Sequence, residues 1–227
     1  MKKTNLGFSL LSFLAFSSGS AFAQVEQVTS MTVSNPAAMV ANIDYFVATG
    51  EGLAKSVTLL RHLHDGTDPS THTVVAIFDD LDVLETSMNQ RATSAAWAIF
   101  ARAGASVSKV NSSSLAIQRQ TWGKDSWEAG NYLAAVLVNA TDEATWIAAV
   151  DTMMGSIKFK NPGMLRIVRL RGGPSTNAVL LVASSYAELI TFMERIESSD
   201  EFATMRGASN TNVVGTTIYK VAKVWNP

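Results

Sequence analysis

Two pairs of basic side chains stand at alternate positions near the ends of two similar apolar stretches: His62 and His64 in the first, Arg169 and Arg171 in the second. Alternate residues of a β-strand point to one face, so each pair is expected on one side of its strand. Arginine suits carboxylate or phosphate groups, and histidine can carry a proton or contact an anion. If this face is turned inward, the four side chains share an anion-binding cavity. If it is not, they are solvated residues beside a turn.

A metal site is the other chemistry that these histidines suggest. His62 and His64 can bind one ion from a single strand face, but a site needs further ligands. His72 lies across the predicted turn, and Asp65 and Asp68 lie within it. The second stretch has no histidine, so the pattern is not repeated, and we predict no metal.

Five aromatic residues are candidates for the wall of an apolar ligand pocket, with packing in the core as the alternative use of such side chains. They are Trp97, Phe100, Trp122, Tyr219 and Trp225. No catalytic or nucleotide-binding motif accompanies them: the chain has no G-x-S-x-G, phosphate loop, H-E-x-x-H or calcium loop. It also has no cysteine, which excludes disulfides and thiol chemistry. We predict no cofactor.

The elements that would position these residues occur twice. Pro69-Ser70-Thr71 recurs as Pro174-Ser175-Thr176, Ser94 matches Ser199, and Trp122 ends its strand as Trp225 does. Such ordered self-similarity indicates a tandem repeat. We place the first repeat at 24–123, a linker at 124–130 and the second repeat at 131–227.

Each repeat is predicted to have the order β-α-β-β-α-β. In the first, strands are expected at 27–33, 56–63, 73–78 and 113–122, with helices starting at Pro36 and covering about 81–103. In the second, strands are expected at 132–138, 165–170, 179–183 and 213–225, with helices following 139–141 and covering 184–205. This order is the ferredoxin-like motif, a four-stranded antiparallel sheet with two helices on one face. The fold class is therefore α+β, and two such sheets can cover each other.

The repeated order, the copied hairpin and the tryptophan that ends each repeat resemble the dimeric α+β barrel superfamily, and within it the antibiotic-biosynthesis-monooxygenase-like group. The resemblance implies a pseudo-dimeric barrel formed by one chain. It also implies cofactor-independent oxygenases and haem-degrading enzymes as relatives. The latter use an Asn, a Trp and a His; Asn35 and Trp97 have suitable places, but no histidine follows Trp97. This departure argues against haem degradation.

The start of the chain resembles an export signal. Lys2 and Lys3 precede an apolar run at 6–16, and Ala21-Phe22-Ala23 is a typical cleavage site. We predict a signal peptide at 1–23 and a periplasmic or secreted protein. Its removal takes away two lysines and no acidic residue, so the formal net charge changes from −1 to −3. That balance gives no reason to expect nucleic acid or an anionic membrane as a partner.

These observations lead to one expectation and two alternatives. We expect an exported soluble protein that binds a small, partly apolar and possibly anionic molecule in or beside the barrel. The alternatives are a cofactor-independent monooxygenase-like enzyme and a structural or interaction protein whose barrel is filled by side chains. With the partner sheet in the same chain, a monomer or a weak homo-oligomer is expected.

Overall fold

The structure is a computed structural model that describes residues 23–66, 68–124, 127–156 and 163–226. The first half of the chain contains β1 (Val25–Val33), α1 (Pro36–Ala48), β2 (Ser56–His64), β3 (His72–Phe78), α2 (Leu81–Arg91), α3 (Ala95–Val107) and β4 (Ser108–Gly123). The second half contains β5 (Tyr132–Ala140), α4 (Glu143–Ser156), β6 (Met164–Arg171), β7 (Asn177–Ala183), α5 (Tyr186–Glu197), α6 (Asp200–Ser209) and β8 (Thr211–Trp225).

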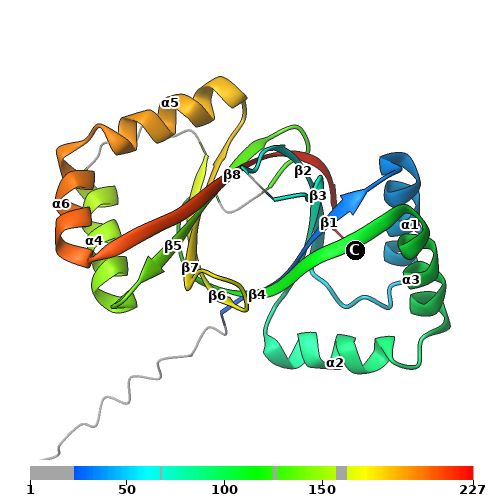
Figure 1. Cartoon of the computed structure of the whole chain (residues 1–227). Helices are drawn as coiled ribbons and strands as arrows, with labels where there is room; N and C mark the ends of the chain where they lie inside the picture. The colour runs from blue at the N-terminus through cyan, green and yellow to red at the C-terminus, as the bar shows by residue number, and fades with distance from the viewer. Residues whose placement is uncertain (1–22, 67, 125–126, 157–162, 227) are drawn as a thin grey trace, which may run out of the picture.

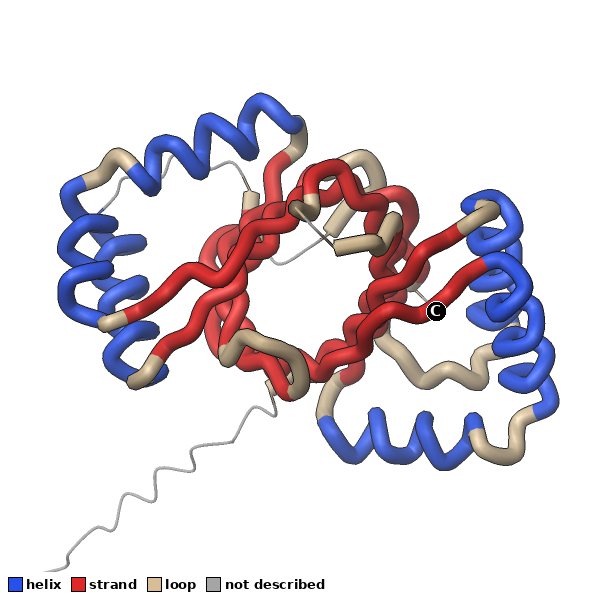
Figure 2. Tube along the Cα trace, viewed as in Figure 1, coloured by secondary structure: helices blue, strands red, loops and turns tan. Residues whose placement is uncertain are grey.

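The eight strands form one closed antiparallel barrel in the order β1-β3-β2-β8-β5-β7-β6-β4. Figure 2 looks into the ring of strands, and Figure 1 shows α1–α3 outside one half of it and α4–α6 outside the other. This arrangement confirms the predicted fold, an α+β protein whose two ferredoxin-like repeats join their sheets.

The last strand of each repeat joins the two sheets. β4 pairs with β1 through its first part, from Ser108 to Ile117, and with β6 through its second part, from Leu115 to Gly123. β8 pairs with β5 and then with β2 in the same way. Each long strand therefore completes its own sheet and borders the sheet of the other repeat, which closes the barrel without free edges.

Hydrophobic side chains form three main layers because each strand alternates between the barrel interior and the helix-covered outer face. The interior cluster draws on strands of both repeats and includes Leu60, Val75, Ala116, Leu133, Met164, Val168, Leu180 and Val221. One outer cluster lies between the sheet and α4–α6 and includes Trp146, Val150, Leu165 and Phe192. The other lies beneath α1 and α3 and includes Met39, Ile43 and Leu59. Apolar side chains of both repeats therefore meet inside the barrel, and each outer face is covered by the helices of its own repeat.

Two predicted helices are wrong in length, and for the same reason. The helix expected at about 81–103 is α2 followed by α3, and the helix expected at 184–205 is α5 followed by α6. Ser94 Oγ accepts a hydrogen bond from the backbone N–H of Trp97 (2.8 Å), and Ser199 Oγ accepts one from Phe202 (3.1 Å). A serine that caps the N-terminus begins a new helix. The matching serines of the two repeats mark these starts.

The predicted signal peptide lies outside the described residues except for Ala23. In the described part of the chain, every helix is too short or too polar to cross a bilayer.

An ion pair inside the barrel links the two repeats. Arg166 Nη1 of β6 donates a hydrogen bond to Glu26 Oε1 of β1 at 2.5 Å, and both side chains are only 2% exposed. Burial raises the pKa of Glu26, while the positive charge and hydrogen bond of Arg166 oppose that rise. Trp127, from the predicted linker, packs against the interior cluster with its ring centroid 5.7 Å from the guanidinium carbon of Arg166.

We expect Arg166→Met to lower the free energy of unfolding by about 3–5 kcal/mol, because Glu26 would be left buried without its counter-charge. The double variant Glu26→Leu/Arg166→Met should recover most of this loss, since neither charge then needs solvation. Urea denaturation of the three proteins measures the difference. A single variant as stable as the original protein would contradict this account of the pair.

Candidate functional site

The structure does not bring the predicted site residues together in one cavity. His62 and Tyr219 meet at one end of the barrel interior, whereas Arg169 and Arg171 lie at an outer groove near α4. The five aromatic residues are divided between the interior and the two helix-covered faces. The prediction that the histidines and arginines share one cavity is therefore wrong, because they lie in different parts of the molecule. Ligand binding by any one of these residues stays a prediction.

The register of the two hairpins explains the separation. Arg61 pairs with His72, eleven residues later, whereas Arg169 pairs with Asn177, eight residues later. Arg169 thus corresponds to Arg61, and His62 corresponds to Leu170. A difference of three residues, being odd, moves side chains to the opposite face of a strand. The match between the two repeats that the sequence suggests pairs His62 with Arg169, which is one residue out of register, so it places both pairs of basic residues on one face.

His64 is separated from His62 by a β-bulge. The pairing of β2 with β8 shifts between His62, which faces Tyr219, and His64, which faces Ile218. His64 is exposed, with its ring centroid 6.1 Å from that of Tyr186 at the start of α5. A bulge re-aims the side chains that follow it. The H-x-H spacing therefore does not form a pair here, and the described residues contain no group of three metal-binding side chains.

A polar network lies at the barrel end beside the β2–β3 hairpin. His62 Nδ1 lies 3.0 Å from Asp65 Oδ2, and His62 Nε2 lies 2.8 Å from Thr73 Oγ1, which is itself 2.9 Å from Ser30 Oγ. The ring of Tyr219 meets that of His62 edge to face at 4.7 Å. His62 is 4% exposed in its side chain and Thr73 is 1% exposed. The network orders the hairpin end. The hydroxyl group of Thr73 is buried within it and is not open to a substrate.

Trp122 and Trp225 anchor each repeat to the other. Trp122 Nε1 at the end of β4 donates a hydrogen bond to Asp151 of α4 (3.2 Å), and Trp225 Nε1 at the end of β8 donates one to Asp44 of α1 (2.5 Å). Hydrogen bonds from Lys223 and then Trp225 lower the pKa of Asp44. The repeated tryptophan therefore has an evident structural use at the junction of the repeats.

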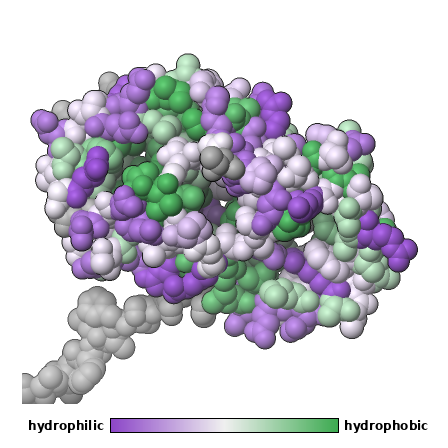
Figure 3. Space-filling view, in the orientation of Figure 1, coloured by the Kyte–Doolittle hydropathy of each residue, from purple (hydrophilic) through white to green (hydrophobic). Residues whose placement is uncertain are grey.

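A cavity with a mostly apolar lining lies outside the barrel, between α4–α6 and the outer face of the second repeat's strands. Its volume is about 130 Å³. The apolar lining comes from three helices and the sheet, and it includes Trp146, Val150, Met153, Met193, Phe202, Met205, Val136, Leu165 and Leu181. Figure 3 shows a hydrophobic patch on the surface in the region of β8 and these helices.

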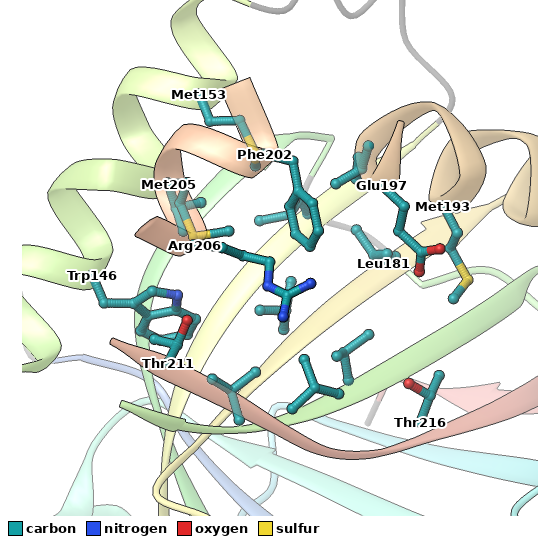
Figure 4. A pocket seen from close by; sticks show the side chains of 17 residues that line it. Trp146, Met153, Leu181, Met193, Glu197, Phe202, Met205, Arg206, Thr211 and Thr216 are labelled. Carbon is teal, nitrogen blue, oxygen red and sulfur yellow. The ribbon is translucent and has the colours of Figure 1, made fainter. Parts of the chain in front are cut away.

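The polar side chains of the cavity stand at its rim. Arg206 of α6 and Glu197 of α5 are both exposed, and Figure 4 shows the guanidinium of Arg206 reaching over the cavity beside Phe202. The guanidinium carbon lies 5.9 Å from the Phe202 ring centroid. Thr211 and Thr216 add hydroxyl groups from β8. The site thus combines an apolar interior with a cationic group at its opening.

The same place in the first repeat is closed by aromatic rings. Phe46, Trp97 and Phe100 form a cluster with ring centroids 4.9–5.3 Å apart. The guanidinium carbon of Arg91 lies 4.7 Å from the Trp97 ring, and its Nη1 donates to Gln27 (3.0 Å).

By position in the matching helices, Phe46 corresponds to Met153, Trp97 to Phe202 and Phe100 to Met205. The second repeat is therefore open where the first is filled, because smaller or more flexible side chains replace the rings.

The spacing of apolar residues along 143–156 predicts that Trp146 and Met153 lie on the buried face of a helix, but it does not connect them with Phe202, Met205 and Arg206. The available signal was the difference between the repeats rather than their likeness. Two of the three aromatic positions of the first repeat carry methionine in the second, which predicts unequal packing.

Haem, the cofactor suggested by the resemblance, does not fit these residues. Haem iron is held in proteins by His, Cys, Tyr or Met side chains, usually with at least one of the first three. The cavity lining contains no His, Cys or Tyr, and the three histidines of the chain are all in its first half. A volume of about 130 Å³ takes one ring rather than a porphyrin.

Known proteins resemble this chain in structure but give no match by sequence. No protein-family model and no curated protein matches the chain. A candidate monooxygenase from Fusobacterium nucleatum superposes with a TM-score of 0.60 over 90% of this chain and 95% of its own, at 12% identity. A heme-binding protein from Thermus thermophilus gives 0.57 over 88% and 92%, at 9% identity. A mutant chlorite dismutase from Candidatus Nitrospira defluvii gives 0.55 over 88% and 91%, at 7% identity.

The chain shares its α+β barrel fold with these proteins. This confirms the resemblance inferred from the repeat. At these identities the comparison establishes the fold alone, so the activity must be argued from the residues of this chain.

The barrel-end network gives a prediction about pH. Burial raises the pKa of Tyr219 to about 12, and hydrogen bonding with Thr217 and Thr73 only partly opposes this. The folded protein therefore keeps this phenol protonated at pH values where the unfolded chain releases the proton. The free energy of unfolding should fall between about pH 10 and 12, by up to about 1.4 kcal/mol per pH unit.

Ultraviolet titration of tyrosinate tests this directly, since the chain has four tyrosines. One should ionise later than an ordinary tyrosine, and Tyr219→Phe should remove that late step together with the stability loss. Removal of the late step by Tyr132→Phe instead would show that the wrong residue has been assigned.

Proposed function

We propose that this protein binds a small, partly apolar anion in the cavity between α4–α6 and the second repeat's sheet. The observation that carries the proposal is the contrast between the repeats: rings of Phe46, Trp97 and Phe100 fill the first, while a cavity of about 130 Å³ stands open in the second. A packed interior leaves few large voids, so a cavity kept at one of two equivalent places suits a ligand.

The size and lining indicate the apolar part of the ligand. A dry apolar cavity of about 150 Å³ accepts benzene, so this one suits a single aromatic ring or a compact aliphatic group. Met153, Met193 and Met205 add flexible thioether side chains that favour contact with ring edges.

The rim indicates the charged part. Arg206 is placed to receive a carboxylate or phenolate of a molecule whose ring fills the cavity, since guanidinium pairs well with planar oxyanions. Glu197 on the opposite side of the opening disfavours a second negative group. A monoanionic aromatic acid is therefore the class that we propose.

Benzoate is a suitable probe, and Met205→Phe is the variant that tests the cavity. It places in the second repeat the ring that Phe100 supplies in the first. We expect benzoate affinity, measured by calorimetry, to fall at least about tenfold, equivalent to about 1.4 kcal/mol. Stability should change by less than about 1.5 kcal/mol, since a swap into available space is tolerated.

The first repeat supplies the matched control, because Phe100→Met makes the reciprocal exchange away from the cavity. It should leave benzoate affinity unchanged. A hydrogen bond to a charged group contributes about 1.5–3 kcal/mol. Arg206 is exposed to solvent, so Arg206→Gln should weaken benzoate binding by less than this. Equal effects of Met205→Phe and Phe100→Met would refute binding in this cavity.

Oxygen consumption during the same titrations separates binding from oxygenase activity in this pocket. The structural similarity to a candidate monooxygenase and an anthrone oxidase-like protein makes that enzyme class the relevant alternative. Ligand-dependent oxygen uptake, lost in Met205→Phe, would turn the binding proposal into an enzymatic one.

Export to the periplasm or medium is also part of the proposal, and it is supported by the charged, apolar and small-residue pattern of residues 1–23. We expect the protein purified from its host to begin at Gln24, as read by N-terminal sequencing. Recovery of the full-length chain in the cytoplasm would overturn this part.

A further inference from the structure

A second concave surface lies at the end of the second repeat, apart from the cavity proposed above. It is bounded by the β6–β7 hairpin, the first turn of α4 and a bulge in β4, and its volume is about 1040 Å³. Three arginines line it, Arg119, Arg169 and Arg171. We call it the arginine groove.

Positive charge in the groove exceeds negative charge. Glu143 accepts hydrogen bonds from Arg169 Nε (2.9 Å) and from Arg119 Nε (3.4 Å), so one carboxylate serves two guanidinium groups. The other acidic side chain, Asp142, accepts hydrogen bonds from Thr145 within its own helix. Desolvation, and then the nearby charges of Arg119 and Arg171, lower the pKa of Arg169. A further oxyanion would relieve this repulsion.

A buried hydroxyl in the groove has no partner in the described structure. Ser175 is 6% exposed, and its Oγ makes no hydrogen bond. Its counterpart Ser70 accepts a hydrogen bond from Asn111 Nδ2 at 2.9 Å. Asn111 occupies a bulge of β4, and the equivalent bulge of β8 carries Val214. An unpaired buried hydroxyl is costly, so a group from outside the chain is its natural partner.

The equivalent place beside the first repeat lacks the same charges. By strand register, Arg171 corresponds to Leu63, and Arg119, which sits in a β4 bulge, corresponds to Ala222 in a β8 bulge. Only Arg169 has a basic counterpart, Arg61. Excess positive charge and the unpaired serine therefore occur together at the arginine groove, to which the first repeat contributes Arg119 from β4, and not at the equivalent place beside the first repeat.

We infer that the arginine groove is a separate anion-binding site, in which Arg119 and Arg171 hold a phosphate or carboxylate group and Ser175 donates its hydroxyl hydrogen. Arginine forms paired hydrogen bonds with the oxygens of either group. Glu143 keeps its hydrogen bond with Arg169 and positions that side chain. The terminal guanidinium nitrogens of Arg119 and Arg171 are then the donors offered to the anion. This site does not depend on the cavity proposed for aromatic anions.

Calorimetric titration of the mature protein with inorganic phosphate, and separately with succinate, tests the site at low ionic strength. We expect saturable binding of at least one probe and a loss of about tenfold or more in Arg171→Gln or Arg119→Gln. Arg61→Gln, the matched change in the first repeat, should leave the affinity unchanged. The preferred probe tells phosphate from carboxylate recognition.

Two variants test the serine without altering charge. Ser175→Ala should weaken the anion by about threefold to tenfold through loss of one hydrogen bond. Val214→Asn supplies the donor that Ser70 has in the first repeat. Its amide would donate to Ser175 Oγ and leave the O–H free for the anion, so the affinity should be retained. Circular dichroism confirms that both variants remain folded.

The inference is overturned if neither probe binds saturably at millimolar concentration, or if Arg61→Gln weakens binding as much as Arg171→Gln. It is also overturned if Ser175→Ala leaves the affinity unchanged, because the hydroxyl would then have no part in the site. Met205→Phe, which closes the cavity, should not affect phosphate or succinate binding, so this test and that of the proposed function fail independently.

Discussion

The pairing of each repeat's last strand with the sheet of the other repeat is the constraint on which the rest of the structure depends. β4 reaches from β1 to β6, and β8 reaches from β5 to β2, so all eight strands lie in a single ring. The tryptophans at the two strand ends hold a helix of the opposite repeat through Asp151 and Asp44. Neither repeat could keep its packing if this exchange were broken, because the interior cluster draws on strands of both.

Buried side chains of both repeats meet inside the closed ring. They include apolar residues, the Glu26–Arg166 pair and the network around His62. Outside the ring, the helix-covered faces of the two repeats are two equivalent places. One is closed by three aromatic rings, and the other retains a cavity beneath α4–α6. A duplicated fold can keep one copy for packing and leave the other open without altering the barrel.

Bulges and hairpin lengths decide which polar groups reach which surface. The bulge in β2 turns His64 away from His62, and the β4 bulge presents Arg119 to Glu143. The two bulges of β4 carry Asn111 and Arg119, whereas the equivalent bulges of β8 carry Val214 and Ala222, so β8 makes no equivalent polar contacts through these side chains. Side-chain chemistry in this protein thus follows single-residue irregularities placed on a regular repeat.

The sequence by itself determined the repeat, the order of strands and helices and the α+β barrel, because hydrophobic periodicity, capping residues and turn residues act locally and occur twice. It missed the breaks at Ser94 and Ser199, although both serines were matched, because a cap inside an apolar run resembles an ordinary helical position. Only the tertiary structure decided the site. The face of a sheet on which a side chain lies depends on strand register. The two hairpins differ in length by an odd number of residues, so Arg169 lies on the opposite face from His62. A cavity likewise depends on how side chains from separate elements fill a shared volume, which no local pattern records.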